Sequence, residues 1–565
     1  MSVLFRHRYT IVLALAIATF CWLGATRYLG AGRDDVFITL YAGQALADGQ
    51  GIVNYNGDRV EMSSSLSHTL IIAAIDLIAP NFVFTLNKIV GGLCGVLTLV
   101  ALYFGRGVMF RVGRWRFPTY ALTLSLTATN PAFLYWSFGG LETPFAGLFL
   151  TCYAVSLLHH RFKQTPFADT AVIGAQCLYI LTRPEGFYLI LFTAVYLALM
   201  KIIARRPLRL RILLIPIAFL ATLTAFRWMY FGALLPNTVY AKSGGIREGV
   251  ANGFVYFTNF YDASLLLLCA FAIQCVLFIV YTRYLAKAFH SLPRRTPLPL
   301  ANILLFGLVL AAQLVVLFSG GDWMEHFRFF APIMPLLIVL TIGAVARCIE
   351  QYSLAANAPR TAAIALVGFG VAAFAVNLRQ SDINIPRPLP RENVSSALPY
   401  SLRDILSAGA NLDQAIMELN AGAGRDQRLL IPFFRDVLPD LHNRSGGLVV
   451  ATGQMGFFPY WLKRMHPDYT VEFVDTLGLC DRTVAQMPLS KDHTGVADGR
   501  FVDEVLDGQV PLLSDYLKSR SPNLVYFLGY DPEVERRLQM YAQHGFHPVQ
   551  KKVGAMVLYK NEDGA

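Results

Sequence analysis

The chain has 565 residues, of which 55% are hydrophobic and only 15% are charged, and its mean hydropathy is +0.47. Soluble domains carry about 25% charged residues, so this composition excludes an ordinary soluble protein. The net charge of +11 does not indicate nucleic acid, because the basic residues lie between apolar blocks and no nucleic-acid-binding motif occurs. We therefore expect a lipid bilayer, and no nucleic acid, as a partner.

Apolar blocks long enough to enter a bilayer recur from residue 9 to residue 377. They cover 9–30, 68–105, 117–134, 143–158, 168–182, 186–202, 212–231, 259–282, 298–318, 331–349 and 361–377. One crossing per block predicts about eleven transmembrane helices. The block 68–105 is too long for one span and contains Pro80 and Lys88, so we expect one crossing there plus a short interfacial or re-entrant piece.

Lysine and arginine gather in alternate connections between these blocks, at 106–116, 161–163, 201–211 and 283–295. Cytoplasmic loops of membrane proteins carry an excess of basic residues. This rule places those connections and the N-terminus in the cytoplasm. The other connections, and the chain after residue 377, are then expected outside.

The composition changes after residue 377. Prolines at 386, 388, 390 and 399 indicate a linker. Short apolar runs at 447–451, 469–474, 524–528 and 555–559 are typical of strands among amphipathic helices. We predict a polytopic α-helical membrane protein with a transmembrane core at 1–377, a linker at 378–399 and an extracytoplasmic soluble α/β domain at 400–565.

The first outside loop begins with two adjacent carboxylates, Asp34 and Asp35, directly after a span. Like charges near a low dielectric can raise one pKa or create a base or metal site. In an extended stretch the two side chains would face opposite sides, so that one would face a substrate and the other would hold a metal or the loop. The alternative is that both acids only stop the helix and stay solvated.

The next outside turns also carry charged candidates. Glu142 lies where a helix is expected to begin, and the helix dipole is a sufficient structural reason for it. Arg183 lies in a tight turn, where it can pair with Glu185 or bind a phosphate. Lys242 is a candidate phosphate contact or a side chain that reaches the membrane surface.

The fifth outside loop runs from Ser319 to Phe330 and contains Gly320-Gly321. Glycines let the backbone approach closely, and Asp322, Trp323, His326 and Arg328 follow among aromatic residues. This mixture favours a functional site, although a tryptophan can also anchor the chain at the membrane interface. In the tail, 453–460 and 474–479 follow expected strands and serve either packing or acceptor binding.

Taken in order, these motifs resemble a known family. Asp34-Asp35-Val36-Phe37, Gly140-Leu141-Glu142-Thr143-Pro144, Arg183-Pro184-Glu185-Gly186, Leu235-Pro236-Asn237-Thr238, Gly320-Gly321-Asp322-Trp323 and Asp475-Thr476-Leu477-Gly478-Leu479 carry the resemblance. The family is the polyprenyl-phosphate-sugar-dependent glycosyltransferases of the C-type superfold. The pattern is most similar to the bacterial terminal arabinofuranosyltransferases of cell wall and pilin. Met62-Ser63-Ser64-Ser65 departs from the usual continuation of the first loop.

This resemblance implies inverting transfer of D-arabinofuranose from polyprenyl phosphate to a glycan or protein acceptor, with pilin as one candidate. Asp35 or Asp34 would be the general base, and Asp35 is favoured because the superfold is described by one leading aspartate. A divalent cation, Mg²⁺ or Mn²⁺, is a candidate cofactor on the same pair. The resemblance places the protein in the bacterial inner membrane. The residues implied in substrate binding are Glu61, Glu142, Arg183, Lys242, Asp322, Trp323, His326 and Arg328, with the phosphate held by some of Arg183, Lys242, His326 and Arg328.

Other functions remain open at the level of sequence. Within the superfold, a mannosyl- or aminoarabinosyltransferase is the alternative, because the motifs do not identify the donor sugar. A polyprenyl-lipid transporter or flippase would place charges near the bilayer midplane. Asp76, Lys88 and Arg227 are the plausible intramembrane charges, so the concentration of charge in the outside loops favours an enzyme over a transporter or an envelope scaffold.

Overall fold

The computed structural model describes residues 2–28, 34–110, 113–242, 246–290, 300–322, 324–355, 433–487, 511–529, 534–552 and 554–560, with single residues at 361, 368, 370, 372, 430, 505 and 508. The expected linker at 378–399, nearly all of the apolar block at 361–377, and Trp323 lie outside these residues.

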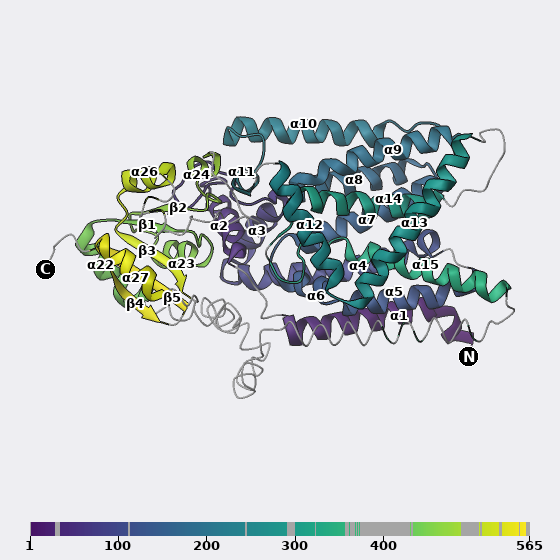
Figure 1. Cartoon of the computed structure of the whole chain (residues 1–565), viewed down its shortest axis with the longest axis horizontal. Coiled ribbons are helices and arrows are strands. Elements are labelled where there is room, and N and C mark those ends of the chain that lie inside the picture. The colour runs from purple at the N-terminus through teal and green to yellow at the C-terminus, as the bar shows by residue number, and fades with distance from the viewer. Residues whose placement is uncertain are drawn as a thin grey trace. The chain divides into compact units, whose positions relative to one another are not determined.

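Helices fill the described chain up to residue 355 (Figure 1). They are α1 (Ser2–Leu23), α2 (Asp35–Ala47), α3 (Leu66–Ile78), α4 (Val83–Met109), α5 (Arg116–Thr129), α6 (Pro131–Phe138), α7 (Thr143–Phe162), α8 (Pro166–Thr182), α9 (Tyr188–Ile202), α10 (Arg211–Phe231), α11 (Asn237–Lys242), α12 (Ile246–Asp262), α13 (Leu265–His290), α14 (Leu300–Phe318) and α15 (Met334–Ala355). Short 3-10 turns cover Pro80–Phe82, Gly113–Trp115 and Pro184–Phe187, and a π-helical turn covers Gly24–Tyr28.

Seven of the described helical stretches are long and apolar enough to cross a membrane, and the pair α6 and α7, bent by 120°, would make eight. The seven are His7–Tyr28, Pro80–Met109, Pro184–Ile202, Arg211–Phe231, Leu266–Ala286, Leu300–Phe318 and Met334–Gln351. Helices α5 and α8, with 14 and 17 residues, are too short to pass this test. The number eleven therefore stays a prediction. The block 68–105 contains one helical stretch that is long and apolar enough to cross, Pro80–Met109, and the shorter apolar helix α3 precedes it. An interfacial or re-entrant position of α3 stays a prediction.

Several helices begin at residues that satisfy the free N–H groups of the first turn. Asn130 accepts a hydrogen bond from the Phe133 N–H at 3.0 Å, and Pro131 follows at the first helical position of α6. Thr165 accepts from the Ala168 N–H in the same way at the start of α8. A side-chain acceptor followed by proline is a favoured helix start. These local signals explain why the long apolar region breaks into separate helices.

The tail contains a five-stranded mixed sheet with the order β2-β1-β3-β5-β4. The strands are β1 (Leu448–Thr452), β2 (Val471–Asp475), β3 (Leu524–Gly529), β4 (Phe546–Lys552) and β5 (Gly554–Lys560), and the helices are α22 (Leu438–Ser445), α23 (Phe457–Met465), α24 (Arg482–Gln486), α26 (Pro511–Arg520) and α27 (Val534–Gln543). Strands β1, β2 and β3 are parallel, whereas β5 pairs antiparallel with β3 and β4.

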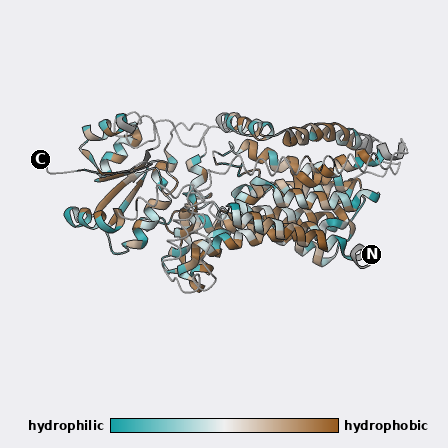
Figure 2. Ribbon diagram, turned by 90° about the horizontal axis from the view of Figure 1, so that it is seen from below, coloured by the Kyte–Doolittle hydropathy of each residue, from teal (hydrophilic) through white to brown (hydrophobic). Residues whose placement is uncertain are grey.

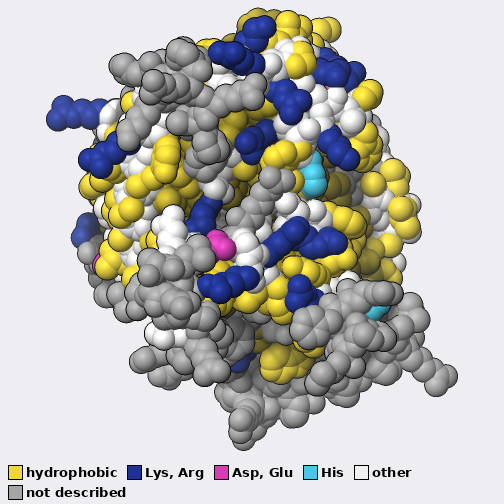
Figure 3. All heavy atoms as spheres, turned by 90° about the vertical axis from the view of Figure 1, so that its right-hand side faces the viewer, with side chains coloured by type: hydrophobic (Ala, Val, Ile, Leu, Met, Phe, Trp, Pro, Cys, Tyr) yellow, Lys and Arg dark blue, Asp and Glu magenta, His cyan; other side chains and the backbone are white. Residues whose placement is uncertain are grey.

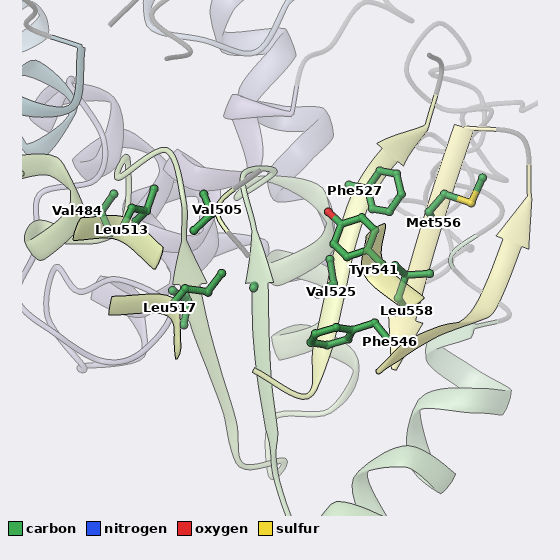
Figure 4. Packing of buried hydrophobic residues seen from close by; sticks show 12 residues of the cluster. Val484, Val505, Leu513, Leu517, Val525, Phe527, Tyr541, Phe546, Met556 and Leu558 are labelled. Atoms are coloured by element: carbon green, nitrogen blue, oxygen red, sulfur yellow. The ribbon is translucent and has the colours of Figure 1, made fainter. Parts of the chain in front are cut away.

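Four of these strands coincide with the runs predicted from sequence, and β4 was missed. β4 contains Pro548 beside a register shift and lies at the edge of the sheet. Proline is tolerated at an edge because no ladder hydrogen bond is lost there. Inside the sheet domain, Val525, Tyr541 and Leu558 pack in one buried hydrophobic cluster (Figure 4). Figure 2 shows the contrast between its hydrophobic strands and hydrophilic outer helices.

The chain divides into two compact units. The first contains Met1–Leu29, Ile89–Leu223 and Gly249–Ile385, and the second contains Gly30–Lys88, Thr224–Glu248 and Pro386–Ala565. The segment 34–65, which was predicted to lie outside, thus belongs to the same unit as the sheet. The predicted domain boundaries near 377 and 400 fall among residues that the structure does not describe. The chain is a polytopic α-helical membrane protein with a small C-terminal α/β domain.

Candidate functional site

The two leading carboxylates stand at the start of a helix rather than in an extended stretch. Asp34 has helical dihedral angles (φ −51°, ψ −43°), and Asp35 is the first residue of α2. The prediction of an extended stretch was wrong, because the chain turns directly into α2. A helix rotates successive side chains by about 100°, so the two carboxylates still point in different directions. Both are partly buried.

Asp34 holds the beginning of α23 in the tail. Its Oδ2 accepts the Gly456 N–H at 2.8 Å and its Oδ1 accepts the Phe457 N–H at 2.7 Å. Burial raises the pKa of the Asp34 carboxyl to about 6; the Phe457 N–H lowers it, the charge of Asp35 raises it, and the Gly456 N–H lowers it. An acidic group at a helix N-terminus satisfies free N–H groups and complements the dipole. Asp34 therefore has a structural task that the sequence did not show.

Gly456 is required by this close approach. A Cβ atom at this position would lie 1.9 Å from the Asp34 carbonyl oxygen and 2.4 Å from its carbonyl carbon. The Tyr55 hydroxyl also donates to the Gly456 carbonyl at 3.4 Å. Backbone meets backbone here, so neither side can yield by changing a rotamer. Gly456, in the tail motif 453–460, thus allows the close contact with Asp34.

We expect Gly456→Ala to weaken this contact. The added methyl group must displace the Asp34 backbone, and overpacking of this kind costs about 1–3 kcal/mol. Thermal unfolding of the purified protein measures the loss. Gly447→Ala is the matched control, because its Cβ would meet the Thr470 oxygen at an ordinary 3.6 Å. Equal stability of the two variants would contradict the close approach.

Two asparagines of the first loop also bind the tail. Asn56 Nδ2 donates to the Phe473 carbonyl at 2.9 Å, and the Phe473 N–H donates to Asn56 Oδ1 at 2.8 Å. This side-chain amide therefore pairs with β2 as a neighbouring strand would. Asn54 Nδ2 donates to the Cys480 carbonyl at 3.0 Å. The loop is fixed to the sheet at several points, which gives Asp35 a defined position.

The tail motif after β2 closes around Asp475. This buried carboxylate accepts the Leu477 N–H at 2.9 Å and the Cys480 N–H at 2.7 Å. Burial raises the pKa of Asp475 to about 7, although N–H groups of Cys480, Leu477 and Gly478 lower it. Asn237 Nδ2 donates to the Gly478 and Leu479 carbonyls of this turn at 2.8 and 3.0 Å. Two motifs noted in the sequence, 235–238 and 475–479, thus meet through hydrogen bonds.

Glu61 forms a buried bidentate pair with Arg227. Arg227 Nε lies 2.8 Å from Oε2, Nη2 lies 3.0 Å from Oε1, and both side chains are 3% exposed. The Asn237 N–H donates to the Glu61 carbonyl. Arg227 was recognised only as an intramembrane charge in the sequence, and its pairing with Glu61 over a long sequence separation could not be foreseen. Lys242, at the end of α11, is exposed.

A second buried polar group in this unit was missed as a candidate. Lys88 is 1% exposed and lies 4.7 Å from the Phe84 ring centroid. The Phe84 ring in turn stacks on the Phe37 ring of α2, with the ring centroids 5.4 Å apart. Phe84 thus links Lys88 to the helix whose first residue is Asp35. The neighbouring Asn87 Oδ1 is 2.7 Å from His68 Nε2. The position of Lys88 inside the apolar block 68–105 was the sequence feature that could have identified it as a candidate.

In the first unit, two arginines from different loops flank one aromatic ring. Arg183 and Arg328 lie 5.3 and 5.1 Å from the Phe329 ring centroid. Arg183 Nη2 is 3.1 Å from Glu142 Oε1 and Nη1 is 3.9 Å from Glu185 Oε1. The short pair is thus with Glu142, at the start of α7, rather than with the neighbour in sequence.

Arg328 makes the second pair of this group. Its Nε lies 2.5 Å from Asp322 Oδ2, and both side chains are buried. The structure therefore brings together four predicted residues as two ion pairs, Glu142 with Arg183 and Asp322 with Arg328, and both arginines lie against the Phe329 ring. Both arginines face a carboxylate, so a phosphate would have to compete with Glu142 and Asp322 for them. We call these four residues with Phe329 the arginine cluster.

His326 lies beside aromatic side chains of the same unit. It has a left-handed backbone (φ 52°), as has Phe327 (φ 50°). Its ring centroid is 4.6 Å from that of Tyr135, and the Trp136 indole donates to the Glu325 carbonyl at 3.1 Å. Left-handed non-glycine residues cost energy and are concentrated at functional sites. Trp323 is not among the described residues.

Metal binding stays a prediction. Among the residues that the structure describes, no group of three or more His, Cys, Asp or Glu side chains could hold a metal ion. Asp34 already accepts two N–H groups, although each carboxylate oxygen has a second acceptor site.

Comparisons with known proteins identify the fold. No family model and no curated protein matches the chain. A solved structure of the oligosaccharyltransferase from Archaeoglobus fulgidus, in complex with Zn and sulfate, is similar with a TM-score of 0.51, 11% identity, and coverage of 94% of this chain and 69% of that chain. The two chains share a fold.

Two further solved structures are similar along nearly the whole chain. ArnT from Cupriavidus metallidurans bound to undecaprenyl phosphate has a TM-score of 0.48 and 14% identity, and covers 98% of both chains. The archaeal oligosaccharyltransferase AglB from Archaeoglobus fulgidus, in complex with an inhibitory peptide and a dolichol-phosphate, has a TM-score of 0.47, 11% identity, and coverage of 100% of this chain and 75% of that chain.

Proposed function

We propose that this protein is a glycosyltransferase of the C-type superfold that transfers a sugar from a polyprenyl-phosphate donor to an acceptor outside the cytoplasm. The shared fold with an oligosaccharyltransferase supports this proposal. The observation that carries it is the arrangement at the first loop. Asp34 directly precedes α2 and is hydrogen-bonded to the tail. Asp35 is the first residue of α2, and its carboxylate has no hydrogen-bond or ion-pair partner among the described residues.

In the proposed reaction Asp35 takes the proton from a hydroxyl group of the acceptor while the oxygen of that hydroxyl attacks the anomeric carbon of the donor sugar. The bond from that carbon to the phosphate oxygen breaks, and polyprenyl phosphate leaves with the electron pair. Attack opposite the leaving group inverts the anomeric centre. Lys242 and Lys88 are candidate cations for the phosphate in the unit that contains Asp35. The family resemblance also implies Arg183, His326 and Arg328 as phosphate contacts. Mg²⁺ or Mn²⁺ on Asp35 and Asp34 would supply additional positive charge.

We further propose D-arabinofuranose as the sugar and a glycan or protein, pilin included, as the acceptor. The motif order from Asp34 to Leu479 supports this choice. Mannose and aminoarabinose are the alternative donors. Glu61, Glu142, Asp322 and Trp323 are proposed to shape the substrate site, with Glu61 acting through its pair with Arg227.

A donor panel tests this function. Purified protein is incubated with polyprenyl phosphates that carry arabinofuranose, mannose or aminoarabinose, together with a glycan or pilin acceptor. We expect acceptor-dependent release of polyprenyl phosphate, fastest with arabinofuranose. Release with another sugar alone would replace the donor but keep the reaction. No release with any sugar, together with movement of labelled lipid across proteoliposomes, would establish a flippase instead.

Cysteine labelling in intact cells tests the membrane sidedness. The distribution of basic residues predicts that positions 321 and 475 face outside and that positions 111 and 205 face the cytoplasm. Asp475 is buried, so the tail is labelled at the nearby exposed Asp468 instead. Cysteines at 321 and 468 should react with an impermeant reagent before permeabilisation, and those at 111 and 205 only afterwards. Labelling of position 321 only after permeabilisation would contradict the proposed bacterial inner-membrane topology.

A further inference from the structure

The connection between α9 and α10 alternates basic and apolar side chains. Its sequence from Lys201 to Arg211 is Lys-Ile-Ile-Ala-Arg-Arg-Pro-Leu-Arg-Leu-Arg, without an acidic residue. Lys201 and Arg206 are exposed, and Leu208 and Leu210 are 43% and 49% exposed. We call residues 201–211 the basic segment. Exposed leucines between cations are unfavourable in water but suit a membrane surface, where apolar side chains enter the acyl region and cations meet headgroups.

The basic segment is held in place by contacts with the α7–α8 connection and with α8. Arg209 Nη2 donates to the Gln164 carbonyl at 2.7 Å, and Gln164 Nε2 donates to the Pro207 carbonyl at 3.4 Å. Arg211 pairs with Asp169, which is buried. Arg209 and Arg211 therefore serve the fold, whereas Lys201 and Arg206 lie on the exposed side of the segment.

Asp169 is itself fixed by a buried chain of polar contacts. Its Oδ1 lies 2.8 Å from His160 Nε2, and His160 Nδ1 lies 2.7 Å from the Tyr196 hydroxyl. These residues come from α7, α8 and α9, so three helices determine where α10 begins. A surface that only had to be soluble would not need such an anchor. The anchor gives the exposed cations a defined position relative to the helix ends.

Basic side chains predominate over acidic ones at one end of the molecule. Figure 3 shows Lys and Arg side chains spread among hydrophobic ones over the end that it faces, with few Asp or Glu side chains. The aromatic ring of Phe167, at the start of α8, is 83% exposed at the adjoining helix turn. Arg205 adopts a left-handed backbone (φ 51°), where glycine would be less strained. The surface thus combines cations with exposed apolar groups at the ends of two spans.

We propose that the basic segment binds an anionic phospholipid headgroup in the leaflet on its own side of the membrane. Lys201 and Arg206 would contact the phosphate, and Leu208, Leu210 and Phe167 would lie among the upper acyl carbons. The interleaved apolar side chains favour a lipid over free phosphate, which would gain nothing from them. This binding does not depend on the sugar-transfer reaction, since it uses none of the residues proposed for catalysis or substrate binding.

Lipid titration by native mass spectrometry tests this proposal on the purified full chain in detergent. The probes are short-chain phosphatidylglycerol, short-chain phosphatidylcholine and inorganic phosphate. We expect wild type to bind phosphatidylglycerol in preference to phosphatidylcholine, and excess inorganic phosphate not to displace it. Lys201→Gln with Arg206→Gln should weaken phosphatidylglycerol binding about 25-fold, at about fivefold for each lost cation. Leu208→Gln with Leu210→Gln should also weaken lipid binding while retaining the charge.

The matched control neutralises two exposed cations outside the segment, Arg114→Gln with Arg283→Gln. It should bind phosphatidylglycerol within about twofold of wild type, because it removes the same number of charges but leaves Lys201 and Arg206 in place to meet the headgroup. An equal loss in this control would mean a diffuse basic face and would overturn the site. Equal binding of both lipids, displacement by phosphate, or wild-type binding by the Lys201 and Arg206 variant would also overturn it.

Discussion

Asp35→Asn should lower sugar transfer by about 10² to 10⁴ while leaving the stability of the protein unchanged, because loss of a general base has this effect on rate. The Asp35 carboxylate has no hydrogen-bond or ion-pair partner within the described residues, so an amide in its place removes the proton acceptor without breaking a contact. Release of polyprenyl phosphate and thermal unfolding, measured on the same preparation, separate the two effects.

Asp34→Asn should behave differently. An asparagine keeps one acceptor oxygen, but its NH₂ group would face an N–H donor of Gly456 or Phe457. Leaving a buried donor without a partner costs about 1–3 kcal/mol, so this variant should lose stability together with activity. Asp48→Asn, at the exposed end of α2, is the control and should change neither. Wild-type rates in both Asp34 and Asp35 variants would show that the pair only marks the membrane edge.

Glu61→Gln should destabilise the protein by about 3–5 kcal/mol, because it leaves the Arg227 charge buried without its counter-ion. Both side chains are 3% exposed, so solvent cannot replace the lost carboxylate. Thermal unfolding in detergent measures the change. Combining Glu61→Gln with Arg227→Gln should recover most of the stability, since neutralising both partners removes the uncompensated charge. The double variant keeps the test informative if the single variant does not fold.

The pair Arg435–Asp436 gives the matched control. Its side chains are 70% and 52% exposed, and Asp436→Asn should leave unfolding unchanged within error. If Glu61→Gln also left unfolding unchanged, the Glu61–Arg227 pair would contribute nothing to stability. If the double variant were as unstable as Glu61→Gln alone, the bidentate geometry rather than the charge balance would be the stabilising feature.

The sequence by itself determined the membrane class, the position of most helices and four of the five strands. Long apolar blocks, Asn130-Pro131 and Thr165-Pro166 are local signals, and each depends on residues a few positions apart. The same locality explains why β4 was missed, since Pro548 argues against a strand unless its edge position is known. The extended conformation expected at Asp34 failed for a related reason: nothing nearby in the sequence shows that α23 supplies the N–H groups that hold it.

Only the tertiary structure decided which partners the charged residues have. It pairs Asp34 with Gly456 and Phe457, Glu61 with Arg227, and Arg183 with Glu142. These partners are far apart along the chain, and a buried charge takes whichever counter-charge or N–H group the packing brings within hydrogen-bond distance. Residue type and order could therefore identify the acids and arginines of the candidate site. Only the fold shows which of them are held by structural contacts and which have no such contact and can act on a substrate.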